Sequence, residues 1–379
     1  MKRLIKWLLA LVVVFVVGLY LTDYEYILKG IRVVYFTGHT TAFIDDHAYF
    51  ENEEIPSSDD PQPWPKHNNY NQLTPTEKLK AINDEYETVA FLLIKNDSLL
   101  YEYYAEDYGP SSRTNSFSMA KSITSAMLGK AIKDGHLSGL DHPVSDFFPK
   151  FKDSGLTVDD LSSMASGLSW DESYKNPFKV MARAYYDDEL AETILDQEIV
   201  SPPGTAYKYL SGNSQLLAMV LEKATGQRLP DYFQSEFVQP MGFENELLWQ
   251  LDDEKNRLVK AYCCIASNAR DFARFGKLYK DYGLWNGTRL LDSSFVATSI
   301  KPRFEESPEY GYGFWLSDHL DKEIFVMQGI LGQYVIVIPE DNLIIVRLGH
   351  KRGKKEDKPF SNDFYEYIEE VYKMTPSGI

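Results

Sequence analysis

Cysteine is nearly absent from this chain of 379 residues, in which only Cys263 and Cys264 occur, side by side. Adjacent cysteines cannot cross-link distant loops, so a disulfide framework is excluded, and two thiols alone do not complete a four-ligand zinc site. We expect both to be buried core thiols. The histidines are scattered, and His39 and His47, which flank two aspartates, are interpreted as loop residues rather than metal ligands. We therefore predict no metal and no cofactor.

Positive charge is also scarce. The chain has 39 Lys and Arg against 56 Asp and Glu, which gives a formal net charge of −17. A nucleic-acid-binding protein needs a basic face to displace counterions, so a nucleic-acid partner is excluded. Hydrophobic residues make up 44% and charged residues 25%, which is typical of a folded globular protein and argues against disorder over most of the length.

One long uncharged run is present, at the N-terminus. Lys2, Arg3 and Lys6 precede the stretch from Trp7 to Leu21, and residues 4–21 are long enough to cross a bilayer. The basic end is expected to stay in the cytoplasm, so residues 1–22 are predicted to be a signal-anchor and the rest extracytoplasmic, periplasmic or at the cell surface. Secretion after signal cleavage is the alternative, although no A-x-A pattern follows the run.

The remaining chain divides into a juxtamembrane segment, residues 23–70, and a main domain, residues 71–379. The segment contains one strand-like apolar run, 31–36, before a proline-rich stretch. In the main domain, β-prone runs lie near both ends, whereas helix and loop patterns fill the middle. We predict a two-lobed α/β (α+β) fold with an antiparallel sheet flanked by helices, formed by residues 71–150 and 265–379, and an inserted all-α lobe at 151–264. The runs that carry this prediction are hairpins at 89–104 and 332–348 and helices at 76–86 and 362–374.

Several common catalytic motifs are missing, among them G-x-S-x-G, H-E-x-x-H, the P-loop and G-x-G-x-x-G. The chain does contain Ser118-x-x-Lys121 at the start of a helix-like stretch, where residues three apart share a face. Free backbone N–H groups at a helix start can stabilise an oxyanion, and a partly desolvated lysine can take the proton of a hydroxyl. The alternative interpretation is an ordinary helix start with a solvated lysine.

Two further stretches could complete such a site. Tyr209 and Ser211 lie where a Pro-Gly loop leads into a helix at 215–226, and a phenol near an ammonium group is expected to favour its anionic form and shuttle protons. Late in the chain, the small residues of Gln328-Gly329-Ile330-Leu331-Gly332-Gln333 indicate a place where the backbone approaches another group closely.

The order and spacing of Ser118-x-x-Lys121, Tyr209-x-Ser211 and Gly329-x-x-Gly332-Gln333 resemble the serine β-lactamase-related hydrolases, over about residues 75–375. Within that family the chain looks most like the branch of class C β-lactamases, esterases and 6-aminohexanoate-dimer hydrolases. The resemblance implies the β-lactamase/transpeptidase-like fold, with Ser118, Lys121 and Tyr209 as catalytic residues. It implies that the N–H group of Ile330 stabilises the oxyanion together with that of Ser118, and that Ser211, Gly329 and Gln328 contact substrate.

Two positions depart from the family pattern. The chain has Tyr209-Leu210-Ser211 where many members have Tyr-Ser-Asn, and Met327-Gln328-Gly329 where β-lactamases have Lys-Thr-Gly. Without that lysine, which suits a β-lactam carboxylate, an esterase or amidase is favoured over a β-lactamase. We predict a membrane-anchored serine hydrolase that cleaves a small-molecule or peptide ester or amide through an acyl-enzyme on Ser118. The alternative is a penicillin-binding-like protein that is acylated without turnover, or an inactive scaffold. The oligomeric state is left open.

Overall fold

The computed structural model describes residues 1–105 and 107–375. Its largest sheet has six antiparallel strands in the order β3–β2–β12–β11–β10–β9. Two neighbouring interior strands come from opposite ends of the domain, since Ile94 of β2 lies opposite Ile344 of β12. This confirms the prediction of an antiparallel sheet built from both ends of the main domain. The strands are β2 (Thr88–Lys95), β3 (Ser98–Tyr104), β9 (Trp315–Ser317), β10 (Ile324–Gly329), β11 (Gln333–Ile338) and β12 (Leu343–Gly349).

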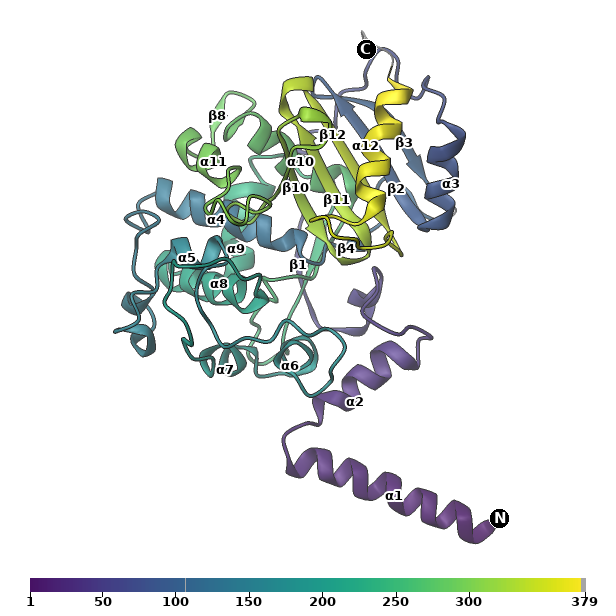
Figure 1. The fold of residues 1–379 in the computed structure, drawn as a ribbon, viewed down its shortest axis with the longest axis vertical. Coiled ribbons are helices and arrows are strands. Elements are labelled where there is room, and N and C mark those ends of the chain that lie inside the picture. The colour runs from purple at the N-terminus through teal and green to yellow at the C-terminus, as the bar shows by residue number, and fades with distance from the viewer. Residues whose placement is uncertain (106, 376–379) are drawn as a thin grey trace.

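Helices cover both faces of this sheet (Figure 1). Val335 and Val337 of β11 belong to the core on the side of α10 (Ala269–Lys280), whereas Tyr334 and Ile336 belong to the core under α3 (Glu77–Glu85) and α12 (Asn362–Met374). Because successive side chains of a strand point to opposite faces, a sheet buried on both sides needs strands that are apolar throughout. This explains the continuous apolar runs in the sequence.

The middle of the chain forms the helical lobe. Its longest helix, α8 (Ser211–Thr225), packs against α4 (Met119–Lys133), which runs between the two lobes. The other helices are α5 (Val158–Ser162), α6 (Val180–Tyr186), α7 (Leu190–Leu195), α9 (Leu229–Phe233) and α11 (Ser293–Ser299). A second sheet has the order β1–β5–β6–β4, and a hairpin joins β7 to β8; these are β1 (Asn52–Ile55), β4 (Thr114–Asn115), β5 (Leu247–Gln250), β6 (Ile265–Ser267), β7 (Leu284–Trp285) and β8 (Thr288–Arg289).

The N-terminal helix α1 (Lys2–Leu21) stands away from the body (Figure 1). Its most apolar 18-residue window has a mean hydropathy of 2.6, and only 6% of that window is buried. The helix is long and apolar enough to cross a membrane, a property that an N-terminal signal sequence shares. The first polar contacts with the body come after α1, where Arg183 of α6 pairs with Asp23 at 2.7 Å and Lys29 pairs with Asp188 at 2.9 Å.

The predicted strand at 31–36 is wrong. The stretch is helical, because α2 (Tyr26–Gly30) continues directly into a π-helical turn, Ile31–Tyr35. The buried positions Tyr26, Ile27, Val33 and Val34, together with Gly30, whose backbone faces the ring of Tyr186, recur at helical spacing. The β-branched residues of this run suggested a strand, but the neighbouring pair of buried valines cannot both face one side of a strand.

Candidate active site

A strained turn between β4 and α4 presents Ser118. The residue is the N-cap of α4, and Phe117 before it has a φ of 45°, in the left-handed region that non-glycine residues rarely adopt. The Oδ1 atom of Asn115 accepts a hydrogen bond of 2.9 Å from the Phe117 N–H group. Gly329 of β10 packs against the same turn so closely that a Cβ atom there would lie 2.4 Å from the Ser116 carbonyl oxygen. The turn therefore has support from both sides.

Lys121 lies one helical turn after Ser118 and faces the same way. Its Nζ atom donates hydrogen bonds to Ser118 Oγ at 3.0 Å and to the Tyr262 carbonyl oxygen at 2.9 Å. The side chain is buried, and this burial lowers the pKa of Lys121 to about 8, against the opposing effect of the Glu172 carboxylate. The lysine is thus near the pKa at which an amine can accept a proton in neutral solution.

Tyr209 completes a triangle with these two residues. Its ring centroid lies 5.0 Å from Lys121 Nζ, and its phenol lies near Ser118. Burial raises the pKa of the Tyr209 phenol well above its ordinary value, and this effect outweighs the influence of the Ser118 hydroxyl, which lowers it. The expectation that the nearby ammonium group favours the phenolate is therefore wrong. Tyr209 keeps its proton and is suited to donate it.

The carboxylate of Glu172 organises the far side of the site. It accepts hydrogen bonds from the Ser211 N–H group at 2.7 Å, the Ser211 hydroxyl at 2.6 Å and Trp170 Nε1 at 2.8 Å. The Tyr174 hydroxyl donates a fourth bond at 2.5 Å. Sequence reasoning missed Glu172, because no fixed spacing joins a loop carboxylate to a helix start 39 positions away. The structure places Ser211 in this network rather than against Lys121.

The end of β10 forms the opposite wall. Ile330 lines the same cavity as Ser118 and Ser211, and Gly329 packs against the turn of Ser116 and Phe117 that precedes Ser118. Within the described ranges, neither the Ser118 nor the Ile330 N–H group has an acceptor, so both are available to an incoming oxygen. Gln328 directly precedes Gly329 in β10, and its Oε1 atom is buried without a hydrogen-bond partner among the described residues. None of the described His, Cys, Asp and Glu side chains cluster as metal ligands would.

A small cavity of about 80 Å³ opens at Ser118. Its walls combine mostly apolar and aromatic side chains from six parts of the chain, including Thr41, Ala42, Met181, Tyr185, Tyr262 and Cys263. A larger hollow of about 690 Å³ lies beside β9 and α11, and none of the candidate residues lines it. Volume alone therefore does not locate the chemistry, whereas the hydroxyl and the lysine do.

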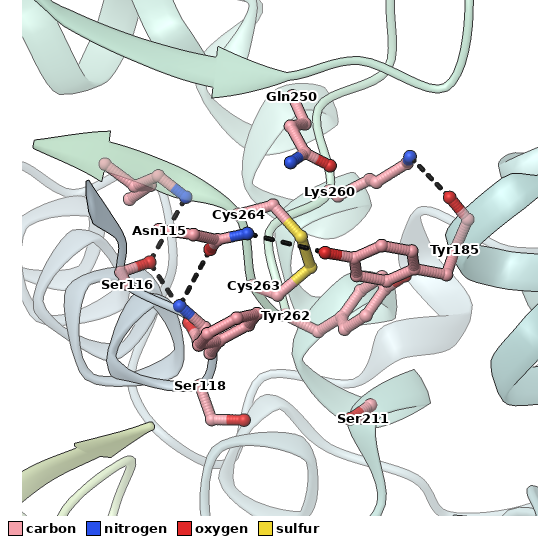
Figure 2. Close-up of a disulfide and its surroundings, with 12 residues drawn as sticks. Asn115, Ser116, Ser118, Tyr185, Ser211, Gln250, Lys260, Tyr262, Cys263 and Cys264 are labelled. Carbon is pink, nitrogen blue, oxygen red and sulfur yellow. Dashed lines mark hydrogen bonds between the residues drawn. A yellow bond between two sulfur atoms is a disulfide. The ribbon is translucent and has the colours of Figure 1, made fainter. Parts of the chain in front are cut away.

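The two cysteines differ from the prediction. Both are buried, as expected, but Cys263 and Cys264 form a disulfide with each other rather than two thiols (Figure 2). Cys264 adopts a φ of 76° in a tight turn, and this left-handed backbone brings neighbouring sulfur atoms together. Tyr262, whose carbonyl oxygen accepts the Lys121 hydrogen bond, directly precedes the pair. Figure 2 shows the disulfide beside Asn115, and Cys263 lines the same cavity as Ser118.

Comparison with known proteins agrees with this geometry. The Beta-lactamase family model matches residues 77–367. The chain belongs to this family. It is 23% identical over 290 residues to the 6-aminohexanoate-dimer hydrolase of Paenarthrobacter ureafaciens, an alignment that covers 70% of this chain and 73% of that protein. It is 24% identical over 256 residues to the teichoic acid D-alanine hydrolase of Staphylococcus aureus, which covers 62% of each chain.

Solved structures show the same fold. A Bacillus anthracis protein provisionally assigned as a 6-aminohexanoate-dimer hydrolase superposes with a TM-score of 0.74 at 19% identity, over 87% of this chain and 92% of that chain. Family and fold together make this β-lactamase-family chain a serine hydrolase that acts on an ester or amide.

The disulfide leads to a direct chemical prediction. Unfolding the protein in guanidinium chloride with iodoacetamide should leave Cys263 and Cys264 unmodified, because bonded sulfur atoms do not alkylate. The same treatment after reduction with dithiothreitol should add two carbamidomethyl groups, counted by intact mass. Alkylation of the unfolded, unreduced protein would show that the residues are thiols.

Proposed function

We propose that the chain is a membrane-anchored, extracytoplasmic hydrolase that cleaves an ester or amide through an acyl-enzyme on Ser118. The observation that carries the proposal is the 3.0 Å contact between Lys121 Nζ and Ser118 Oγ, made by a buried lysine whose pKa falls to about 8. Lys121 removes the hydroxyl proton as Ser118 attacks the acyl carbon. The N–H groups of Ser118 and Ile330 bind the oxyanion, and Tyr209 donates a proton to the leaving group.

The cavity supports a small, uncharged acyl group as the part held near Ser118. Its lining is largely apolar and aromatic, and the strand beside it carries Met327-Gln328-Gly329, with no lysine to bind a carboxylate. The names of both curated relatives contain an amino acid unit, 6-aminohexanoate in one and D-alanine in the other. We therefore include aminoacyl esters and linear amides among the substrates to be tested, and rank β-lactams below them.

The competing proposal is a protein that becomes acylated without turnover, or a scaffold that has lost its chemistry. Ser118, Lys121 and Tyr209 are all present and in contact, which supports turnover. Rates of acylation and deacylation distinguish these proposals, because a penicillin-binding-like protein accumulates an acyl-enzyme that does not decay.

The nucleophile is tested with Ser118→Ala in detergent-solubilised full-length protein. The variant should lose fluorophosphonate labelling and hydrolysis of p-nitrophenyl esters, an alanyl ester and a linear amide dimer, because no other hydroxyl lies against Lys121 Nζ among the described residues. A matched control is Ser138→Ala, since the Ser138 hydroxyl contacts only His142 in an exposed loop. Labelling that persists in Ser118→Ala would remove Ser118 from the mechanism.

Activity should depend on pH through Lys121. The base acts when neutral, so log kcat/KM should rise with a slope of about one below pH 8 and level off above the pKa of about 8. Lys121→Arg should be inactive across this range, because a guanidinium group does not lose its proton. Tyr209→Phe should keep the same rise of log kcat/KM with pH, but at a lower kcat/KM. The decrease in kcat/KM should be greater for the amide than for the activated ester. A pH-independent profile between 6 and 9 would contradict the role of Lys121.

The membrane proposal rests on α1 and the basic residues around its start. Full-length protein should remain in the membrane fraction after alkaline carbonate washing, and removal of residues 1–22 should release it. N-terminal sequencing of the cellular protein gives the decisive comparison. A mature N-terminus near residues 19–23 in a soluble fraction would show a cleaved signal peptide instead.

A further inference from the structure

The juxtamembrane segment reaches into the catalytic site. Thr41 and Ala42 line the same cavity as Ser118, although they precede the nucleophile by more than one structural element. Two residues later, the Ile44 carbonyl oxygen accepts a hydrogen bond of 2.7 Å from the Asn115 N–H group of β4. The segment thus runs beside the strand that leads into the nucleophile turn.

Asp46 ends this stretch with a fully buried carboxylate. Its Oδ1 atom accepts hydrogen bonds from Asn115 Nδ2 at 2.8 Å and Gln250 Nε2 at 3.1 Å, and its Oδ2 atom accepts one from the Tyr185 hydroxyl at 2.6 Å. These three donors come from β4, β5 and α6. A buried carboxylate needs such donors, because burial alone disfavours the charged form.

The Asp46 carboxylate determines which way the Asn115 amide points. An ionised carboxylate only accepts hydrogen bonds, so the NH₂ group of Asn115 must face Asp46. The oxygen of the same amide then faces the Phe117 N–H group, to which it is bonded at 2.9 Å. Figure 2 shows Asn115 in this position, between Tyr185 on one side and the nucleophile turn on the other.

This orientation matters because Phe117 holds a left-handed backbone, with a φ of 45°, directly before Ser118. Such a conformation is strained for a non-glycine residue and persists only where neighbouring contacts enforce it. If the Asn115 amide turned over, its NH₂ group would face the Phe117 N–H group and the turn would lose its acceptor.

We infer that Asp46 is a positioning residue for the nucleophile, acting through Asn115 and the Phe117 backbone, so that the juxtamembrane segment is part of the catalytic apparatus. The inference rests on the proposed function, in which Ser118 is the nucleophile. Two consecutive hydrogen bonds form this relay, from Asn115 to Asp46 and from the Phe117 N–H group to Asn115. The relay starts at Asp46, outside the family-matched residues 77–367, and ends beside Ser118.

Other charged and titratable groups also face Asp46. Lys260 lies in the turn before β6 and donates a hydrogen bond of 2.7 Å to the Tyr185 carbonyl oxygen. Tyr186 and Tyr262 also lie near the Asp46 carboxylate. Burial raises the pKa of Asp46 to about 6 and lowers the pKa of Lys260 to about 7. The carboxylate is therefore ionised at the pH values near 8 at which Lys121 becomes a base.

The test compares Asp46→Asn with its neighbour Asp45→Asn in full-length protein. Asp46→Asn replaces the shared carboxylate by a neutral amide and puts an NH₂ group against the Tyr185 hydroxyl, which weakens the hold on the Asn115 amide, so kcat should fall about 10- to 100-fold while KM changes by less than about threefold. The rate of fluorophosphonate labelling should fall in parallel. Asp45→Asn is the matched control, because the Asp45 carboxylate bonds the Tyr108 hydroxyl at 3.1 Å and does not contact Asn115. It should retain wild-type kinetics.

A second variant guards against a folding defect. Asn115→Ala interrupts the same relay without adding charge or bulk, and should show the same loss of kcat. Combining it with Asp46→Asn should add little, because both changes remove one pathway. Thermal unfolding of each variant, with assays well below its transition, separates positioning from loss of folded protein.

Three outcomes would overturn the inference. They are a wild-type kcat and labelling rate in Asp46→Asn, a loss that only tracks the folded fraction, or losses in the two single variants that multiply in the double variant. A failure of the proposed function is seen separately, since it appears as labelling that persists in Ser118→Ala whatever the Asp46 variants do.

Discussion

The ammonium group of Lys121 has two protein acceptors, Ser118 Oγ at 3.0 Å and the Tyr262 carbonyl oxygen at 2.9 Å, in a place that is closed to water. Burial lowers the pKa of the ammonium group, so more of the amine is neutral and able to accept a proton near neutral pH, and the proposed role of Lys121 as a base depends on keeping it dry. The surrounding structure serves this need. Thr124, one turn further along α4, donates to the Ala261 carbonyl oxygen at 3.0 Å, which ties the helix to the chain that holds the lysine.

Two carboxylates extend this arrangement in different directions. Glu172 gathers Trp170, Tyr174 and Ser211 on the side of the helical lobe, and Asp46 gathers Asn115, Tyr185 and Gln250 on the side of the smaller sheet. Neither carboxylate contacts Ser118. Each holds several polar groups in place, because both oxygens of a carboxylate accept hydrogen bonds from the donors around them. The hydrogen bonds of Glu172 and Asp46 thus hold the site on both sides, whereas Ser118 and Ile330 face the open cavity.

The sequence was enough for the sheet and for the residues along one helix face. The apolar runs at 89–104 and 332–348 predicted the strands found there. The three-residue spacing of Ser118 and Lys121 predicted that both lie on one side of α4. It was not enough where contacts join distant loops, so Glu172 and Asp46 were missed as site residues. The helical spacing from Tyr26 to Val34 was present in the sequence but was masked by β-branched side chains. The disulfide depends on the left-handed backbone of Cys264, which no spacing rule predicts.

The pairing of Ile94 with Ile344 has a consequence for the order in which the molecule is made. During synthesis, β2, β3 and the nucleophile helix leave the ribosome long before β10, β11 and β12 exist. The interior strand β2 has β3 on one side but no partner on the other until the end of the chain arrives, so formation of the complete sheet is late and slow. The Ile330 wall is absent for the same period. A growing or truncated chain therefore carries Ser118 and Lys121 but not the wall of the cavity that Ile330 forms, and the proposed site is complete only when the last strands are in place.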